Sequence, residues 1–376
     1  MGEPTPLRKK WEGTMSDRER FRAQMHYEPF DRCFNAEFGY WAENFEQWDI
    51  FKRNGITNND QAHRFFSFDR MAVIGGRIWM YPPFEYQVIQ EDGEKQVIRD
   101  QNGLIGEKPK DGHSTIPHFT DSTVKTPEDW KRVKEERFRV DDPARRVDVE
   151  SLKTEHPPDR DYPLGVGTGS MIGKIRDMLT LEGLAYAVCD YPDMVEDMVE
   201  TSCQLVEHHL DQVLPHFEFD FAAGWEDISC NTGPLVPMDF FRNAVVPRYK
   251  RIANKLTAYG VDIWYTDSDG DVRPMIPSFM EAGLNAMFPW EVKGCGHPGR
   301  VLDEYGSQLR IIGGVDKMEL QKGRDAIRKY MESLVPYVER GGFIPHVDHR
   351  CPPDVDPDDY LYYLDVKEEL LGMSAG

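Results

Sequence analysis

Phe219-Asp-Phe-Ala-Ala-Gly-Trp-Glu-Asp-Ile228 and Val261-Asp-Ile-Trp-Tyr-Thr266 are the two stretches that decide the fold. Each is an apolar run with the length of a buried strand, and the residues between them, 237–259, have the spacing of an amphipathic helix. Similar apolar or glycine-rich runs recur at Leu164–Gly169, Ala286–Pro289, Leu309–Val315 and Gly342–Val347. Strands that alternate with helices in this way are typical of a parallel β-sheet.

The alternation continues to the end of the chain, with helix-like stretches at 191–216, 237–259, 273–282, 298–306 and 322–340. Segments 34–39 and 70–75 bring the strand count to about eight, which is the number needed to close a barrel. We therefore predict an α/β fold with a single (β/α)8 TIM barrel over residues 16–372. A doubly wound open sheet is the alternative, but Gly165-Val-Gly-Thr-Gly169 lacks the GxGxxG spacing of a dinucleotide-binding turn.

The N-terminal part departs from this pattern. Residues 1–15 predict a disordered leader, and Ser16-Asp17 followed by Glu19 predicts the start of an N-terminal helical extension. Residues 86–90 and 95–99 alternate around Asp92-Gly93, which predicts a β-hairpin within an excursion from the barrel at about 76–110.

Composition excludes several classes of function. The chain has 376 residues with 66 acidic against 45 basic side chains, a net charge of −21, so we expect binding neither to nucleic acid nor to anionic membranes. No apolar run approaches the roughly 20 residues that span a bilayer. The six cysteines are scattered, as reduced thiols are. We expect a cytoplasmic protein, and the sequence leaves a homodimer open.

Ionisable and aromatic side chains gather where the strand-like runs end, and barrel enzymes place their catalytic groups at the C-terminal ends of strands. The groups that follow these runs are Glu37-Phe-Gly-Tyr40-Trp41, Trp225-Glu226-Asp227, Asp267–Asp271, Trp290-Glu291, Gly314-Val-Asp316 and His346–Cys351. We therefore predict an active site built from these segments.

A metal site is predicted from Asp267, Asp269 and His349, a donor set suited to zinc with an open fourth position. The run Asp267-Ser-Asp-Gly-Asp271 is not an EF-hand, because Val272 and Ser278 stand where Gly and Glu are required. A solvated turn is the alternative interpretation. Whether His346 or Cys351 also contributes stays open.

Catalytic roles are assigned to the acid pair Glu226 and Asp227, and to Glu291. A salt bridge from the pair to Arg248 or Arg273 is the alternative. Substrate binding is assigned to Tyr40, Trp41 and Trp225, together with Glu37, with packing inside the barrel as the alternative for the first aromatic cluster.

Several motifs carry a resemblance to the uroporphyrinogen decarboxylase superfamily, which includes the corrinoid-dependent methyltransferases. They are Arg18-Glu-Arg-Phe21, Pro29-Phe-Asp-Arg32, Gly313-Gly-Val-Asp316, Gly341-Gly-Phe-Ile344 and Pro352-Pro353. Where the decarboxylases have an arginine-rich motif, this chain has Glu37–Trp41, so porphyrinogen is disfavoured as a substrate. The zinc-binding His-x-Cys of the methyltransferases aligns with Asp267-Ser-Asp269, and their distal Cys aligns with His349.

The resemblance implies a methyltransferase that moves a methyl group from a small methylated substrate, such as a methoxy-aromatic compound, to the cobalt of a separate corrinoid protein. The corrinoid is expected on a partner because the chain lacks a DxHxxG-type loop. Oxygen ligands would leave zinc more Lewis-acidic than thiolates would, which suits O-demethylation. A decarboxylase of a small carboxylic acid and a catalytically inactive binding subunit are the alternatives.

Overall fold

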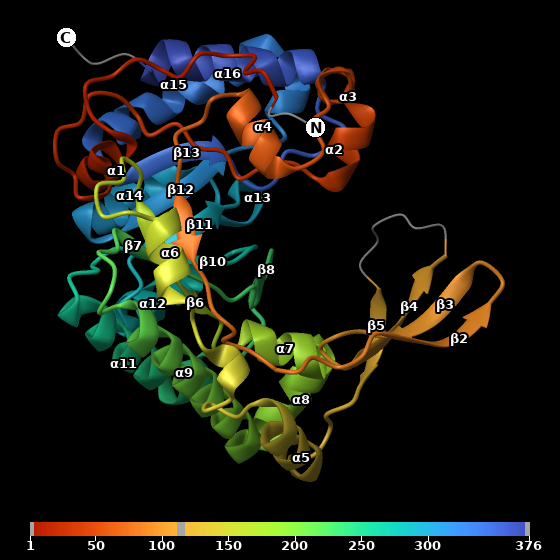
Figure 1. Cartoon of the computed structure of the whole chain (residues 1–376). Helices are drawn as coiled ribbons and strands as arrows, with labels where there is room; N and C mark the ends of the chain where they lie inside the picture. Colours follow the sequence, from red (N-terminus) through yellow and green to blue (C-terminus); the bar gives the residue numbers. More distant parts are fainter. Residues whose placement is uncertain (1–3, 111–116, 373–376) are drawn as a thin grey trace.

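The computed structural model describes residues 4–110 and 117–372 (Figure 1). Within these ranges seven strands form one parallel sheet, in the spatial order β1-β6-β7-β10-β11-β12-β13. Their bounds are Ala72–Ile74, Leu164–Gly169, Phe221–Trp225, Trp264–Asp267, Ala286–Trp290, Arg310–Val315 and Phe343–Val347. The predicted runs therefore form strands in sequence order, and the sheet curls into the predicted (β/α)8-type barrel with helices outside it.

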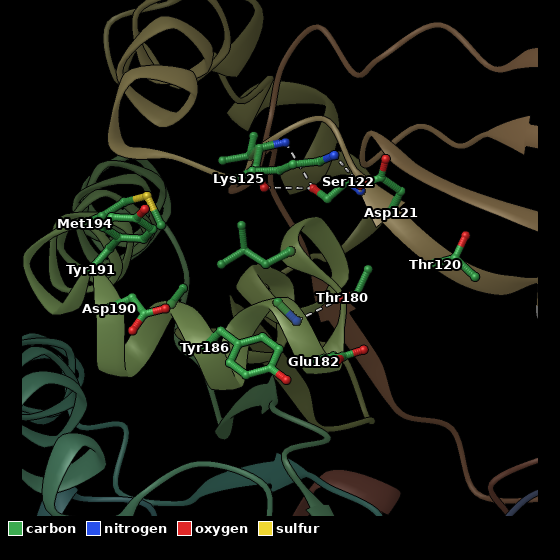
Figure 2. Close-up of a pocket in the computed structure, with 14 residues that line it drawn as sticks. Thr120, Asp121, Ser122, Lys125, Thr180, Glu182, Tyr186, Asp190, Tyr191 and Met194 are labelled. Atoms are coloured by element: carbon green, nitrogen blue, oxygen red, sulfur yellow. Dashed lines mark hydrogen bonds and ion pairs between the residues drawn. The ribbon is translucent and has the colours of Figure 1, made fainter.

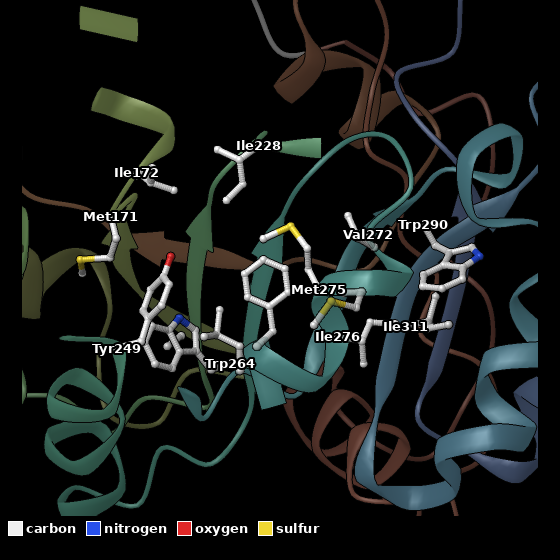
Figure 3. Packing of buried hydrophobic residues seen from close by; sticks show 14 of the residues in the cluster. Met171, Ile172, Ile228, Tyr249, Trp264, Val272, Met275, Ile276, Trp290 and Ile311 are labelled. Carbon is white, nitrogen blue, oxygen red and sulfur yellow. The ribbon is translucent and has the colours of Figure 1, made fainter. Parts of the chain in front are cut away.

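Helices pack on the outside of the sheet through apolar faces, and all of them except those at 292–295 and 357–371 fall in the predicted stretches. They are α9 (Pro192–Val213), α10 (Met238–Phe240), α11 (Val246–Ala258), α12 (Ile276–Ala282), α13 (Val292–Cys295), α14 (Pro298–Tyr305), α15 (Arg324–Arg340) and α16 (Pro357–Leu371). Figure 3 shows part of the buried cluster between them and the sheet, where Tyr249 of α11 lies against Trp264 of β10, with ring centroids 5.4 Å apart. In the described ranges, no helix combines the length and the apolar character needed to cross a bilayer.

The barrel interior is filled by side chains that alternate along the strands. One buried cluster joins residues from the beginnings of five strands with Phe34 and with two residues of the helix α1 (Asp17–Met25). The strand residues, which lie between one position before and two positions after the first residue of their strands, are Phe221, Ile263, Ala286, Ile312 and Ile344. Phe21 and Met25 of α1 belong to this cluster, so α1 plugs the end of the barrel where the strands begin. Ser16 and Glu19 cap α1 reciprocally, as its sequence predicted.

The strand expected at 34–39 does not form a ladder, which corrects the prediction for the first strand. The segment is extended and lies between β1 and β13, since the amide of Asp69 donates to Asn35 O and the amide of Cys351 donates to Gly39 O, at 2.8 Å each. Amides of the segment donate hydrogen bonds to side-chain oxygens and not to a neighbouring strand. Phe34 N–H donates to Gln24 Oε1, and Tyr40 N–H donates to Asn59 Oδ1. The segment therefore occupies the eighth position of the barrel with only one isolated bridge, Tyr40 to Cys351.

Residues 4–15 are packed, in contrast to the disordered leader expected there; residues 1–3 lie outside the described part. The amide of Leu7 donates to Phe65 O at 2.7 Å, Arg8 pairs with Asp365 at 2.5 Å, and Trp11 is buried. The segment runs beside α4 (Asn59–Phe65) and α16. Two more short helices, α2 (Ala42–Gln47) and α3 (Asp49–Asn54), precede α4 and lie with it above the barrel in Figure 1.

The predicted hairpin is present as β2 (Gln87–Asp92) and β3 (Lys95–Arg99), but it belongs to a larger antiparallel sheet. β4 (Leu104–Pro109) and β5 (His118–Ser122) extend it, and the whole sheet projects away from the barrel (Figure 1). The chain returns through α5 (Pro127–Arg137), α6 (Val149–Glu155), β6, α7 (Gly173–Leu179) and α8 (Leu181–Asp190). A short hairpin, β8 (Ser229–Cys230) with β9 (Gly233–Pro234), follows β7.

Candidate active site at the barrel mouth

Three carboxylates converge at the C-terminal ends of β7 and β10. Asp267 is the last residue of β10, Asp269 lies two residues further on, and Asp227 follows β7. One oxygen of each side chain lies within 4.8 Å of an oxygen of the other two. We call these residues the acidic trio. The amide of Asp269 donates to Asp227 Oδ1 at 3.3 Å, which links the two loops.

The surroundings of the acidic trio disfavour its negative charge. Burial raises the pKa of Asp267 to about 8, with further contributions from Asp227 and Asp269, and Arg350 opposes the shift. Burial also raises the pKa of Asp227, again with a contribution from Asp269. Adjacent carboxylates in a partly buried cleft favour either a shared proton or a bound cation. A cation site is therefore consistent with the local electrostatics.

His349 lies beside the acidic trio, with Nε2 3.6 Å from Asp269 Oδ2. Its ring stacks on Trp41, at a centroid distance of 5.4 Å, and meets the edge of Phe38. The predicted metal set of Asp267, Asp269 and His349 is therefore brought to one place. Asp227 joins the two aspartates more closely than His349 does, and sequence spacing alone did not assign it as a ligand.

Behind the trio, Glu291 and Lys317 connect the loops that follow β10, β11 and β12. Glu291 Oε2 accepts from Gly270 N–H at 2.9 Å, and Glu291 Oε1 accepts from Lys317 Nζ at 3.0 Å. Lys317 Nζ also lies 3.7 Å from the buried Asp348. Glu291 thus fixes the loop that carries Asp269. Lys317 was not predicted, because no motif marks it and it follows its strand by two residues.

Glu226 is buried away from the acidic trio, which corrects its predicted catalytic role. It is fully buried and accepts hydrogen bonds from the amides of Met171, Ile172 and Gly173, from Ser170 Oγ and from the Tyr249 hydroxyl. These donors include the first turn of α7, so Glu226 holds that helix against β7. Burial raises its pKa to about 7, and the donors oppose the shift.

The alternative salt bridges to Glu226 are not formed either. Arg248 pairs with Glu196 and Glu200, and Arg273 forms a two-point contact with Asp271 at 2.7 and 2.8 Å.

Glu37 and Tyr40 are structural, which corrects their assignment to substrate binding. Glu37 is buried, and its Oε1 accepts from Tyr363 and Lys367 of α16 at 2.6 Å each. The Tyr40 side chain is also fully buried, and its hydroxyl lies 2.7 Å from the hydroxyl of Tyr360. Residues 34, 36 and 38 face the barrel interior, so Glu37 points outward to α16.

Of the predicted aromatic contacts, Trp41 and Trp225 reach the mouth. The Trp41 side chain is 39% exposed, and Trp225 is partly exposed under Lys174, whose Nζ lies 5.0 Å from the ring centroid. His346 and Cys351, which the sequence left open, are buried below this level. Burial lowers the pKa of His346 to about 4, so its imidazole is neutral in the folded chain.

A second hollow lies away from the strand ends (Figure 2). It is a cavity of 380 Å³ between β5, α8 and the start of α9, and its wall includes Lys125, Glu182 and Tyr186. Neither the acidic trio nor His349 lines it, so the chemistry predicted from the sequence belongs to the barrel mouth.

Comparison with known proteins supports the fold. No family model and no curated protein matches the chain. Among solved structures, a methyltransferase from Methanosarcina mazei is similar, with a TM-score of 0.57, 13% identity, and coverage of 95% of this chain and 99% of that one. A B12-independent methionine synthase from Shewanella sp. W3-18-1 matches more weakly, with a TM-score of 0.38, 9% identity and coverage of 73% of each chain. The chain thus shares the fold of the Methanosarcina methyltransferase, in agreement with the resemblance drawn from its sequence.

Proposed function

We propose that this chain is a methyltransferase that moves a methyl group from a small methoxy-aromatic compound to the cobalt of a separate corrinoid protein, assisted by a divalent metal ion. The observation that carries the proposal is the acidic trio at the mouth of a barrel, beside Trp41 and Trp225. The shared fold with a methyltransferase supports methyl transfer as the reaction class.

The residues of the mouth fit a metal ion by the chemistry of their donors. Asp227, Asp267 and Asp269 offer carboxylate oxygens, which are ligands for hard or borderline divalent cations such as zinc. Such an ion supplies Lewis-acid stabilisation of the oxygen that the methyl group leaves.

The side chains of this chain position the substrate and handle the proton. Trp41 and Trp225 present ring faces and edges that hold an aromatic substrate in the mouth. Glu291 keeps the Asp269 loop in place through the amide of Gly270. The corrinoid would accept the methyl group as the oxygen–methyl bond breaks, and His349 Nε2 is the group that we assign to protonate the departing oxygen.

The decarboxylase alternative is less well supported. Its proton donor was to come from the acid pair, but Glu226 is sealed under α7 and already accepts hydrogen bonds on both oxygens. Asp227 remains in the cleft, but its partners are the other carboxylates of the trio.

The test measures bound metal and methyl transfer in Asp269→Asn, with Asp271→Asn as a matched control. Asp271 is a nearby carboxylate that pairs with Arg273 and does not belong to the trio. We expect about one zinc per wild-type and control chain by mass spectrometry, and loss of the metal in Asp269→Asn. Methylation of a cobalt(I) corrinoid from a methoxybenzene should then fall at least 100-fold, the scale of an electrostatic group lost from an active site. Full activity in Asp269→Asn would contradict the assignment.

A further inference from the structure

A cavity of 310 Å³ lies where β1, β6 and β7 end, and one of its lining residues, Trp225, stands two residues before Asp227 of the acidic trio. Its walls are the loop 76–81 after β1, Gly169 and Ser170 after β6, Lys174 in the first turn of α7, and Trp225 at the end of β7. This volume is at the lower end of ligand sites in proteins, so it suits a ligand with a single ring.

The charged side chains that line this cavity are positive, whereas the chain as a whole is negative. The chain carries a net charge of −21, yet the residues lining the cavity include Lys174 and Arg77 and no Asp or Glu. Lys174 Nζ lies over the ring of Trp225, and its nearest carboxylate, Asp177 Oδ2, is 3.8 Å away, beyond hydrogen-bond length. Lys174 thus makes one long ion pair within its own helix and lies on an aromatic wall of the cavity.

The wall formed by loop 76–81 is held rigidly from behind. The buried Arg145 donates to Trp79 O at 2.7 Å and also to Arg77 O, and it donates to Arg137 O at 3.0 Å. Trp79 packs edge-on against Phe138 at a centroid distance of 5.0 Å. The cavity is therefore preformed, which lowers the entropic cost of ordering a ligand.

We propose that this cavity binds the anionic end of the substrate, so that the substrate class is methoxylated aromatic carboxylates. Lys174 pairs with the carboxylate, and Trp225 packs on the ring. The acidic trio begins two residues beyond Trp225 and repels the same carboxylate, so the methoxy end points to the trio. That the substrate carries a methoxy group rests on the proposed function. That the ligand carries a negative charge rests on the cavity alone.

The test is calorimetric binding of 4-methoxybenzoate and of neutral methoxybenzene, without any corrinoid. We expect the acid to bind about tenfold more tightly than the neutral compound, which corresponds to one charge-assisted contact. Lys174→Met should remove this difference and Lys174→Arg should keep most of it. Lys131→Met, an exposed lysine of α5 outside the cavity, should change neither affinity. If Lys174→Met does not fold, as judged by its thermal unfolding, Lys174→Gln replaces it.

Equal affinities for the two compounds, or an unchanged preference in Lys174→Met, would overturn the inference. Methyl transfer to a cobalt(I) corrinoid is measured separately. Lys174-dependent binding of the acid without any methyl transfer leaves the cavity assignment standing and rejects the proposed function. Methyl transfer from both compounds that is unaffected by Lys174→Met supports the proposed function and rejects the cavity assignment.

Discussion

Glu226 and Asp227 are neighbours in sequence with different surroundings. Residues 221, 223 and 225 of β7 face the barrel interior, so Glu226 points outward to the amides of α7. The backbone then turns, with a positive φ of 47° at Asp227, and directs its carboxyl group into the mouth. The alternation along β7 could have assigned Glu226 to the outer face, but the positive φ of a non-glycine residue could not be predicted from sequence.

Asp267 gives a prediction about the stability of the metal-free protein. Its pKa is raised to about 8, chiefly by burial, whereas it is near 3.8 in an unfolded chain. The unfolded state therefore releases this proton first, and the contribution of Asp267 to stability is lost as the pH rises from about 4 to 8. Asp267→Asn, which stays neutral, should be more stable than the wild type by a few kcal/mol at pH 8 and about equal to it near pH 4.

The measurement is urea unfolding with a chelator present at both pH values. Asp271→Asn is the control, because Arg273 lowers the pKa of Asp271 and its replacement should bring no gain at pH 8. An Asp267→Asn protein that is no more stable at pH 8 would mean that burial and the neighbouring carboxylates do not raise the pKa of Asp267.

His346 predicts the opposite dependence on pH. Burial lowers the pKa of His346 from 6.5 to about 4. Between these two pH values the imidazole is therefore protonated in the unfolded chain and neutral in the folded chain. Its contribution to stability is complete above pH 6.5 and is lost as the pH falls through 4, by about 3 kcal/mol in all. His346→Gln should flatten this part of the pH profile of unfolding, measured in urea between pH 7 and 4. A profile identical to that of the wild type would rule out a neutral buried imidazole.

At the scale of elements, the segment 33–41 shows how far a pattern predicts structure. Its apolar residues Phe34, Ala36 and Phe38 alternate and do face inward, as a barrel strand requires. No ladder forms, because the amides of the segment donate their hydrogen bonds to the side chains of Gln24, Asp69 and Asn59 and not to a neighbouring strand. Those acceptors are distant in sequence, so no local pattern could reveal them.

The contact between this segment and α16 gives a third prediction. Glu37 and Lys367 form a buried ion pair at 2.6 Å, and the Lys367 side chain is fully buried. Glu37→Ala leaves the ammonium group without its carboxylate and should destabilise the fold by about 3–5 kcal/mol in urea unfolding. The double variant Glu37→Leu with Lys367→Met should recover much of this loss. A stable Glu37→Ala protein with weakened substrate binding would instead restore a substrate role for Glu37.

At the scale of the whole molecule, the order of strands and helices was predictable because period-2 and period-3.6 patterns alternate from residue 164 onward. The insertion was predicted only in part. The Asp92-Gly93 turn marked β2 and β3, whereas the Asn102-Gly103 turn that leads from β3 into β4, a motif of the same kind, was not used to extend the prediction to β4 and β5. Likewise the strand ends located the candidate site, while the places of Lys317 and Lys174 and the convergence of Asp227 with Asp267 and Asp269 depend on spacing between separate loops.

Metal binding predicts a change in the stability of the whole chain. An ion that binds the folded state alone stabilises it by about 2.7 kcal/mol at a concentration of 100 times Kd. Zinc should therefore raise the Tm of the wild type by a few degrees at pH 7.5, measured by calorimetry. Asp269→Asn should show no such rise, and Asp271→Asn should keep it. An equal rise in all three proteins would indicate binding at other sites.

The packing of α1 in one end of the barrel determines the end at which small molecules can enter and leave. Phe21 and Met25 fill the barrel where the strands begin, so α1 closes that end, and we expect ligands to enter at the opposite end, the mouth. Under the proposed function, the corrinoid protein would present its cobalt at this mouth and would block it. The small substrate must then bind before the partner does, and the demethylated product can be released only after the partner dissociates. Under the proposed function, steady-state kinetics should therefore show a compulsory order, with the small molecule first on and last off.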